Sequence, residues 1–244
     1  MISCDRKEYN MSGHSKWATT KRHKAVIDAK RSSLFTKLAR NITVAAKTGK
    51  NLDLAIELAK KASMPKDNIQ RAIDKGTGKI ASDEIVNFNY EAYGPGGIGV
   101  IINILTDKKS RALSEIKAAL NKHNGRIATS GAVSYLFEEQ GVITLNKSGQ
   151  TLPADEIEML IIDSGAKDYE IEDNTVYVYT NPKELAQIKQ KIEFKALHIN
   201  DAKLEYSPKN YVNIDEAKKE QVIALLSALE DLDDVNEIFT NADL

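Results

Sequence analysis

The order of apolar segments in the second half of the chain leaves very few folds open. Residues 139–208 alternate strand-like and helical patterns in the order strand, helix, strand, strand, helix, strand, which is the ferredoxin-like arrangement. The last segment, residues 209–244, has the pattern of one helix and one strand. A single helix and strand cannot bury a core of their own, so this segment must complete another domain.

Residues 80–138 predict the domain that it completes. They contain two strand patterns around the turn Gly94-Pro95-Gly96-Gly97, then a helix, then a third strand AVSYLF at 132–137. This unit lacks a second helix to cover its sheet. We therefore predict a discontinuous middle domain formed by 80–138 and 209–244, with the ferredoxin-like domain of 139–208 inserted into it.

Residues 33–79 predict a helical bundle. Leu34, Leu38 and Ile42 recur on one face of a first amphipathic helix, and Gly49 ends it. A second helix begins near Asn51, a capping residue type, and a third begins at Pro65. Short connections between three helices favour an antiparallel bundle. The predicted class is thus α+β with several domains, a helical bundle followed by two α/β sandwich domains.

The charge of the chain is divided between its two parts. The 244 residues have a formal net charge of −1, but residues 1–79 hold 18 Lys+Arg against 7 Asp+Glu. The remaining residues, 80–244, hold 16 Lys+Arg against 28 Asp+Glu. The net values of +11 and −12 indicate a polyanion-binding module joined to acidic domains.

Residues 1–32 predict a basic, partly flexible arm. Its cations surround the helical wheel instead of sharing one face, so a helix here would have little to bury and would order on a polyanion. The alternative interpretation of such a run is a solvated surface. Trp17, the only tryptophan, suits stacking on a base or packing on the bundle. The candidate nucleic-acid-binding residues are His14, Lys16, Trp17, Lys21, Arg22, Lys24, Lys30, Arg31, Lys37 and Arg40.

No pattern in the chain favours catalysis, a cofactor or a metal. The glycines 94, 96 and 99 fit a dinucleotide fingerprint, but they lead into a strand and no helix comes after them to hold a pyrophosphate. The histidines and Cys4 lack metal-ligand spacing. The acidic residues at 230–234 are most simply a solvated helix end. One cysteine and no long apolar run predict a cytoplasmic protein without a membrane partner.

Several sequence motifs resemble the YebC/PmpR family. They are GHSKWA, DAKR, LFTKLARNITVAAKTG, MPKDNIQRAIDKGTG, YEAYGPGGIGVI and the late FTN, and the resemblance runs from Met11 to Leu244. It implies three domains, a helical bundle followed by two α/β domains. It also implies a transcriptional regulator that binds DNA, while other members of the family are translation factors acting at the ribosome, for example at polyproline.

Three functions remain open. The first is a non-catalytic, DNA-binding transcriptional regulator, and the second is a ribosome-associated translation factor that binds ribosomal RNA. The third is a protein-interaction scaffold whose acidic domains bind basic proteins. A lysine contacts DNA and RNA phosphates alike, so charge does not separate the first two.

Overall fold

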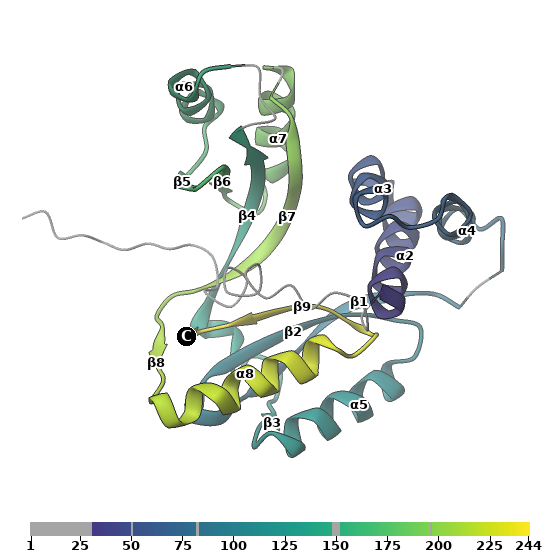
Figure 1. Ribbon diagram of the computed structural model, residues 1–244, viewed down its shortest axis with the longest axis vertical. Coiled ribbons are helices and arrows are strands. Elements are labelled where there is room, and N and C mark those ends of the chain that lie inside the picture. Colours follow the sequence, from purple (N-terminus) through teal and green to yellow (C-terminus); the bar gives the residue numbers. More distant parts are fainter. Residues whose placement is uncertain (1–30, 50, 82, 148–151, 196) are drawn as a thin grey trace, which may run out of the picture.

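The computed structural model describes residues 31–49, 51–81, 83–147, 152–195 and 197–244 (Figure 1). A bundle of helices stands beside two antiparallel sheets, each with helices packed on it. This arrangement confirms the predicted α+β class, with a helical region ahead of two α/β units. How far each unit folds independently at the predicted limits stays a prediction.

The bundle contains α2 (Arg31–Thr48), α3 (Leu52–Lys61) and α4 (Lys66–Gly76). Ile42, Ala59 and Ile69 lie at its centre, one from each helix. Gly49 comes directly after α2 with a φ of 68°, a left-handed conformation that glycine adopts without steric cost. The bundle core is small, so its helices also need packing against the other units.

Gly76 lies where the end of α4 crosses α2. A Cβ at this position would stand 2.4 Å from the backbone oxygen of Thr43 and 2.6 Å from Cβ of Ala46. We expect Gly76→Ala to lower the free energy of unfolding by about 1–3 kcal/mol, because backbone atoms must move to admit the methyl group. Urea unfolding checks this against Lys75→Ala at a neighbouring exposed residue; equal midpoints for the two variants would contradict it.

The middle sheet has the strand order β3-β1-β2-β9, all antiparallel. Its strands come from both ends of the predicted discontinuous domain: β1 (Val86–Tyr93), β2 (Gly99–Thr106), β3 (Arg126–Ile127) and β9 (Val235–Thr240). The last long strand thus pairs with β2, as the element order predicts. A short parallel pair, β8 (Val212–Asn213) with β10 (Ala242–Asp243), lies beside the sheet.

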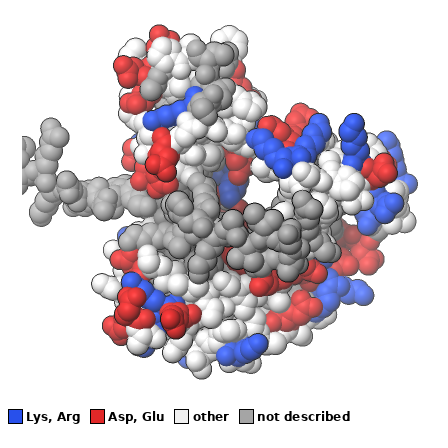
Figure 2. All heavy atoms as spheres, in the orientation of Figure 1, with Lys and Arg blue, Asp and Glu red and all other residues white. Residues whose placement is uncertain are grey.

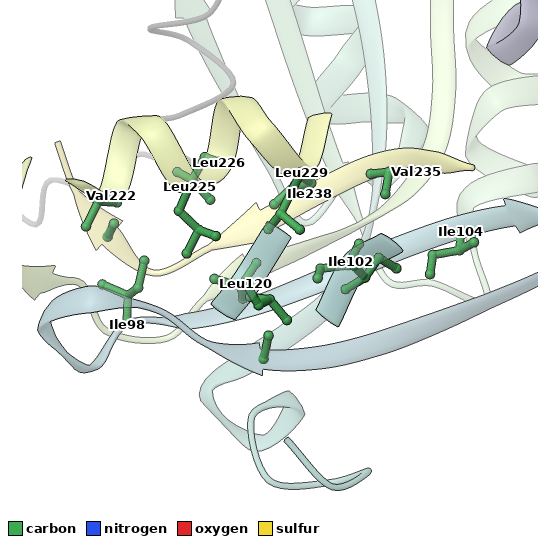
Figure 3. Close-up of a cluster of buried hydrophobic side chains, with 14 of the residues drawn as sticks. Ile98, Ile102, Ile104, Leu120, Val222, Leu225, Leu226, Leu229, Val235 and Ile238 are labelled. Carbon is green, nitrogen blue, oxygen red and sulfur yellow. The ribbon is translucent and has the colours of Figure 1, made fainter. Parts of the chain in front are cut away.

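Two helices cover one face of the middle sheet, α5 (Lys109–Lys122) and α8 (Glu216–Glu230). Figure 3 shows leucines of α8 pointing at isoleucines of β2 and β9. Ile102 and Ile238 are paired across these strands and both face the helices. Helix α8 is therefore the cover that residues 80–138 lack by themselves.

The predicted strand at 132–137 is wrong. Residues 134–136 form a 3-10 turn, η2 (Ser134–Leu136), and the third strand of the sheet is the two-residue β3. The apolar side chains of Val133 and Phe137 are buried against the back of the sheet, beside Ile101 and Phe239. A buried loop can have the same apolar composition as a strand, and for this reason the sequence pattern predicted a strand here.

A buried carboxylate holds this loop in place. Glu91 on β1 accepts hydrogen bonds from the backbone N–H groups of Gly131 (2.7 Å), Val133 (2.5 Å) and Ser134 (2.9 Å). Burial alone would raise the pKa of Glu91, but the three N–H groups outweigh burial and lower it from the usual 4.5.

Because the folded pKa of Glu91 is lowered, its contribution is present above about pH 4.5 and is lost as the pH falls through the folded pKa. We expect Glu91→Gln to cost about 2 kcal/mol at neutral pH, since the amide sets a donor against N–H donors. Urea unfolding at neutral pH and at a series of decreasing pH values below 4.5 checks this. A cost that stays constant across that range would contradict it.

The inserted unit has the strand order β5-β6-β4-β7, all antiparallel, which is the ferredoxin-like order. Its elements are β4 (Phe137–Asn146), α6 (Ala154–Ser164), β5 (Asp168–Glu172), β6 (Thr175–Thr180), α7 (Leu185–Phe194) and β7 (Ile199–Pro208). Strands β4 and β7 pair from Phe137↔Pro208 onward, beginning next to the middle sheet. Strand β4 thus begins before residue 139 and runs without a break across the predicted domain limit.

Candidate nucleic-acid interface

The structure describes only part of the predicted site. His14, Lys16, Trp17, Lys21, Arg22, Lys24 and Lys30 lie outside the described residues. Arg31 is the first residue of α2, so the arm joins the rest of the protein at this helix. The two remaining candidates, Lys37 and Arg40, lie on α2 and have described side chains.

The charged groups of Lys37 and Arg40 contact the middle domain. Nζ of Lys37 donates to the backbone oxygen of Glu230, and Nη1 of Arg40 donates to that of Asp233. These acceptors belong to the end of α8 and the turn into β9. The C-terminal carbonyls of a helix carry partial negative charge, which suits cations. In this structure the two predicted phosphate contacts hold α2 on the α8–β9 turn.

Asp234 joins this contact as a buried carboxylate. Its side chain is 2% exposed and lies 2.8 Å from Nη2 of Arg40. Arg111 of α5 donates to the same carboxylate at 3.1 and 3.2 Å and to Asp107 at 2.8 Å. The pKa of Arg111 is raised from its usual value, chiefly by the hydrogen bond to Asp234. The expected solvated helix end is therefore wrong for Asp234, because two guanidinium groups surround it.

Hydrogen bonds between amides connect all three units across the back of the middle sheet. Asn41 of α2 donates to Asn236 (3.0 Å), which donates to Asn103 (3.1 Å), and Asn103 donates to Asn89 (2.8 Å). Asn89 in turn donates to the hydroxyl of Tyr206 on β7 at 3.1 Å. Each asparagine thus bonds to the next, so the bundle, the middle sheet and the inserted unit share one polar network.

Asn51 adds a second contact between the bundle and the inserted unit. It occupies the predicted N-cap position of α3, but its side chain does not cap the helix. The side-chain nitrogen donates to the backbone oxygen of Ala202 at 3.1 Å, and the oxygen accepts from Lys189 at 3.1 Å. The residue type suggested a cap, while its actual partners lie more than a hundred residues away.

The exposed face of the bundle is basic, and the predicted site residues do not include it. Figure 2 shows Lys and Arg side chains gathered over α3 and α4. Lys61 and Lys79 pair with Glu57 (3.0 Å) and Asp74 (3.7 Å). Four exposed cations form no ion pair within the described residues: Lys60, Lys66, Arg71 and Lys75. The excess of Lys and Arg in residues 33–79 was the signal that could have found them.

The residues that the structure describes hold neither a metal-ligand cluster nor a nucleotide-binding turn. Among them, no group of His, Cys, Asp and Glu is arranged to hold a metal ion. The glycine turn, η1 (Pro95–Gly97), leads into β2 and offers no helix N-terminus. No described helix is both long and apolar enough to cross a membrane.

Comparison with known proteins identifies the family of this chain. Residues 15–79 match the family model of the TACO1/YebC protein N-terminal domain, and residues 66–242 match that of the TACO1/YebC second and third domain. The chain belongs to the TACO1/YebC family. The resemblance found in the sequence motifs is thereby confirmed. The N-terminal family domain spans both the predicted arm and the bundle.

Individual members of the TACO1/YebC family match along nearly their whole length. A probable transcriptional regulatory protein of Pseudothermotoga lettingae is 42% identical over 241 residues, covering 96% of this chain and 94% of its own. One of Rubrobacter xylanophilus is 41% identical over 242 residues, covering 96% of both chains. A crystal structure of a conserved hypothetical protein from Aquifex aeolicus has 39% identity and a TM-score of 0.80, covering 94% of this chain and 97% of its own.

Proposed function

We propose that this chain is a non-catalytic regulatory protein of the cytoplasm that binds DNA through its basic N-terminal region. The observation that carries the proposal is the division of charge, +11 in residues 1–79 against −12 in residues 80–244. The names of its relatives, probable transcriptional regulatory proteins, support a role in transcription. DNA is the polyanion that such a role requires.

In this proposal both the arm and the bundle contribute cations to DNA binding. The cations of the arm contact phosphates: Lys16, Lys21, Arg22, Lys24, Lys30 and Arg31. His14 and Trp17 belong to the same basic segment. The unpaired cations of α3 and α4 extend the basic surface, whereas Lys37 and Arg40 hold α2 on the middle domain. Phosphate contacts position a protein without reading sequence, so we expect weak sequence preference from the chain alone.

The negative charge of the middle and inserted units limits where DNA can bind. Their net negative charge is repelled by phosphates, so bound DNA lies against the bundle side and away from the inserted unit. This places the inserted unit where a protein partner can reach it while DNA is bound. The contacts of α2 keep the bundle oriented on the middle domain during binding.

Binding of the full chain to labelled duplex DNA, measured by anisotropy across salt concentrations, tests the proposal. If about six phosphates are neutralised, log K falls with log salt at a slope of roughly −5. A slope near zero would contradict phosphate-dominated binding. Sedimentation of the chain with ribosomes after DNase treatment, together with failure to bind duplex DNA, would favour ribosomal RNA as the partner instead.

A further inference from the structure

The outer helices of the inserted unit expose large apolar side chains. Met159 and Ile162 lie three residues apart on α6 and are 64% and 60% exposed. Phe194, the last residue of α7, is 90% exposed. These three residues, the α6–α7 patch, lie on the layer that covers one face of the ferredoxin-like sheet. Burial of such side chains stabilises a protein, so three of them left in water indicate a surface that a partner can cover.

A cleft of about 340 Å³ lies between the two helices, and of the three patch residues Phe194 lines it. Leu160 and Asp163 line it from α6, and Gln190 and Phe194 line it from α7. Lys191 also lines the cleft and donates to the backbone oxygen of Ser164 at 2.8 Å. Apolar residues with polar groups at the rim are what a docked side chain needs for burial and orientation.

The charge on the α6 side of the patch is negative. Asp155, Glu156 and Asp163 are exposed on α6 and form no ion pair within the described residues. The α6 helix contains no cation. On the α7 side, two exposed lysines line the cleft, Lys191 and Lys195. A partner seated on α6 therefore meets carboxylates flanking apolar side chains.

We propose that the α6–α7 patch docks a basic segment of another protein, one that presents apolar side chains between lysines or arginines. Apolar side chains of the segment cover Met159 and Ile162 and enter the cleft, while its cations pair with the unpaired carboxylates of α6. The same carboxylates repel nucleic acid and anionic lipid. They also repel the same face of a second copy, so a self-complementary dimer through α6 brings like charges together.

Two synthetic helical peptides with the same leucine face test this proposal, one with lysines and one with glutamates on the polar face. Anisotropy with the full chain is compared between the native protein and a Met159→Ser/Ile162→Ser variant. Both side chains are largely exposed, so the variant keeps its fold, which circular dichroism verifies. We expect the lysine peptide to lose at least about tenfold in affinity through the two substitutions.

Matched controls separate the patch from other surfaces. Tyr135→Ser removes an equally exposed apolar side chain elsewhere, 64% exposed, and is expected to leave lysine-peptide binding unchanged. The glutamate peptide can bind the basic N-terminal region, and that binding is expected not to depend on Met159 or Ile162. Asp155→Asn with Asp163→Asn is expected to weaken the lysine peptide and to reduce the salt dependence of its binding.

Three results would overturn the proposal. One is a lysine peptide whose affinity is the same for the native protein and the Met159→Ser/Ile162→Ser variant. Another is a dimer in sedimentation that these substitutions convert to a monomer, because the patch is then an interface between copies. The last is binding to phosphatidylglycerol vesicles that the same substitutions abolish, because the patch is then a membrane surface.

Discussion

Replacing Lys21, Arg22, Lys24, Lys30 and Arg31 together with glutamine is expected to weaken duplex DNA binding by at least about 100-fold at low salt. Each neutralised phosphate contributes about 0.9 to the salt slope, so the loss of five contacts is expected to reduce the slope by about 4–5. Anisotropy titrations of the full chain at several salt concentrations measure both quantities. The fold is expected to be unaffected, because these residues lie before the bundle core.

The matched control removes the same charge from the acidic domains. Glutamine replaces five exposed lysines there: Lys108, Lys117, Lys122, Lys183 and Lys195. If location matters more than total charge, this control keeps nearly full affinity and an unchanged slope. A third variant measures how much the bundle contributes to DNA affinity. In it, glutamine replaces Lys60, Lys66, Arg71 and Lys75. Unchanged DNA binding in the arm variant would exclude the arm from the site and would leave the scaffold function as the better account.

Asp234→Ala is expected to lower the free energy of unfolding by about 2–3 kcal/mol and to release α2 from the α8–β9 turn. Removing one partner of a buried pair typically costs about 3–5 kcal/mol. The lower figure is expected because Arg111 is 40% exposed and recovers water when its partner is lost. Urea unfolding gives the free energy, and small-angle scattering reports whether the bundle separates from the middle domain.

Asp233→Ala serves as the control for this prediction. Asp233 is exposed, and its backbone oxygen, the acceptor for Arg40, survives the substitution. Its unfolding midpoint and radius of gyration are expected to match the native protein. If Asp234→Ala and Asp233→Ala behave alike, the buried carboxylate contributes nothing measurable, and the contact depends on backbone acceptors alone.

The element order predicted the connectivity because helix and strand periods are local properties. The leftover helix and strand after residue 208 required a partner sheet, and β9 does pair with β2. The loop at 132–137 escaped prediction because its conformation depends on Glu91, some forty residues away. Local pattern carries no information about such a distant hydrogen-bond acceptor.

Two of the predicted phosphate-contacting residues also take part in the packing between units. The sequence shows that Lys37 and Arg40 are cations on an amphipathic helix, which is consistent with phosphates or with an acidic domain. Only the folded arrangement brings them to residues 230–234, near the far end of the chain. In the sequence the acidic cluster and these two cations are far apart and suggest separate surfaces, although they form one interface.

The long separation between α2 and its docking partners has a consequence for the order in which the protein is made. Lys37 bonds to a residue 193 positions later, and Asn41 to one 195 positions later. Domains fold as they leave the ribosome, starting from the N-terminal end. The bundle therefore leaves the ribosome while Asp234 and Asn236 are still unsynthesised, and until residues 230–234 are made Lys37 and Arg40 lack the acceptors that later hold them. Each new molecule passes through a stage in which the cations of α2 are not yet paired with the carboxylate and carbonyl groups that hold them in the finished protein.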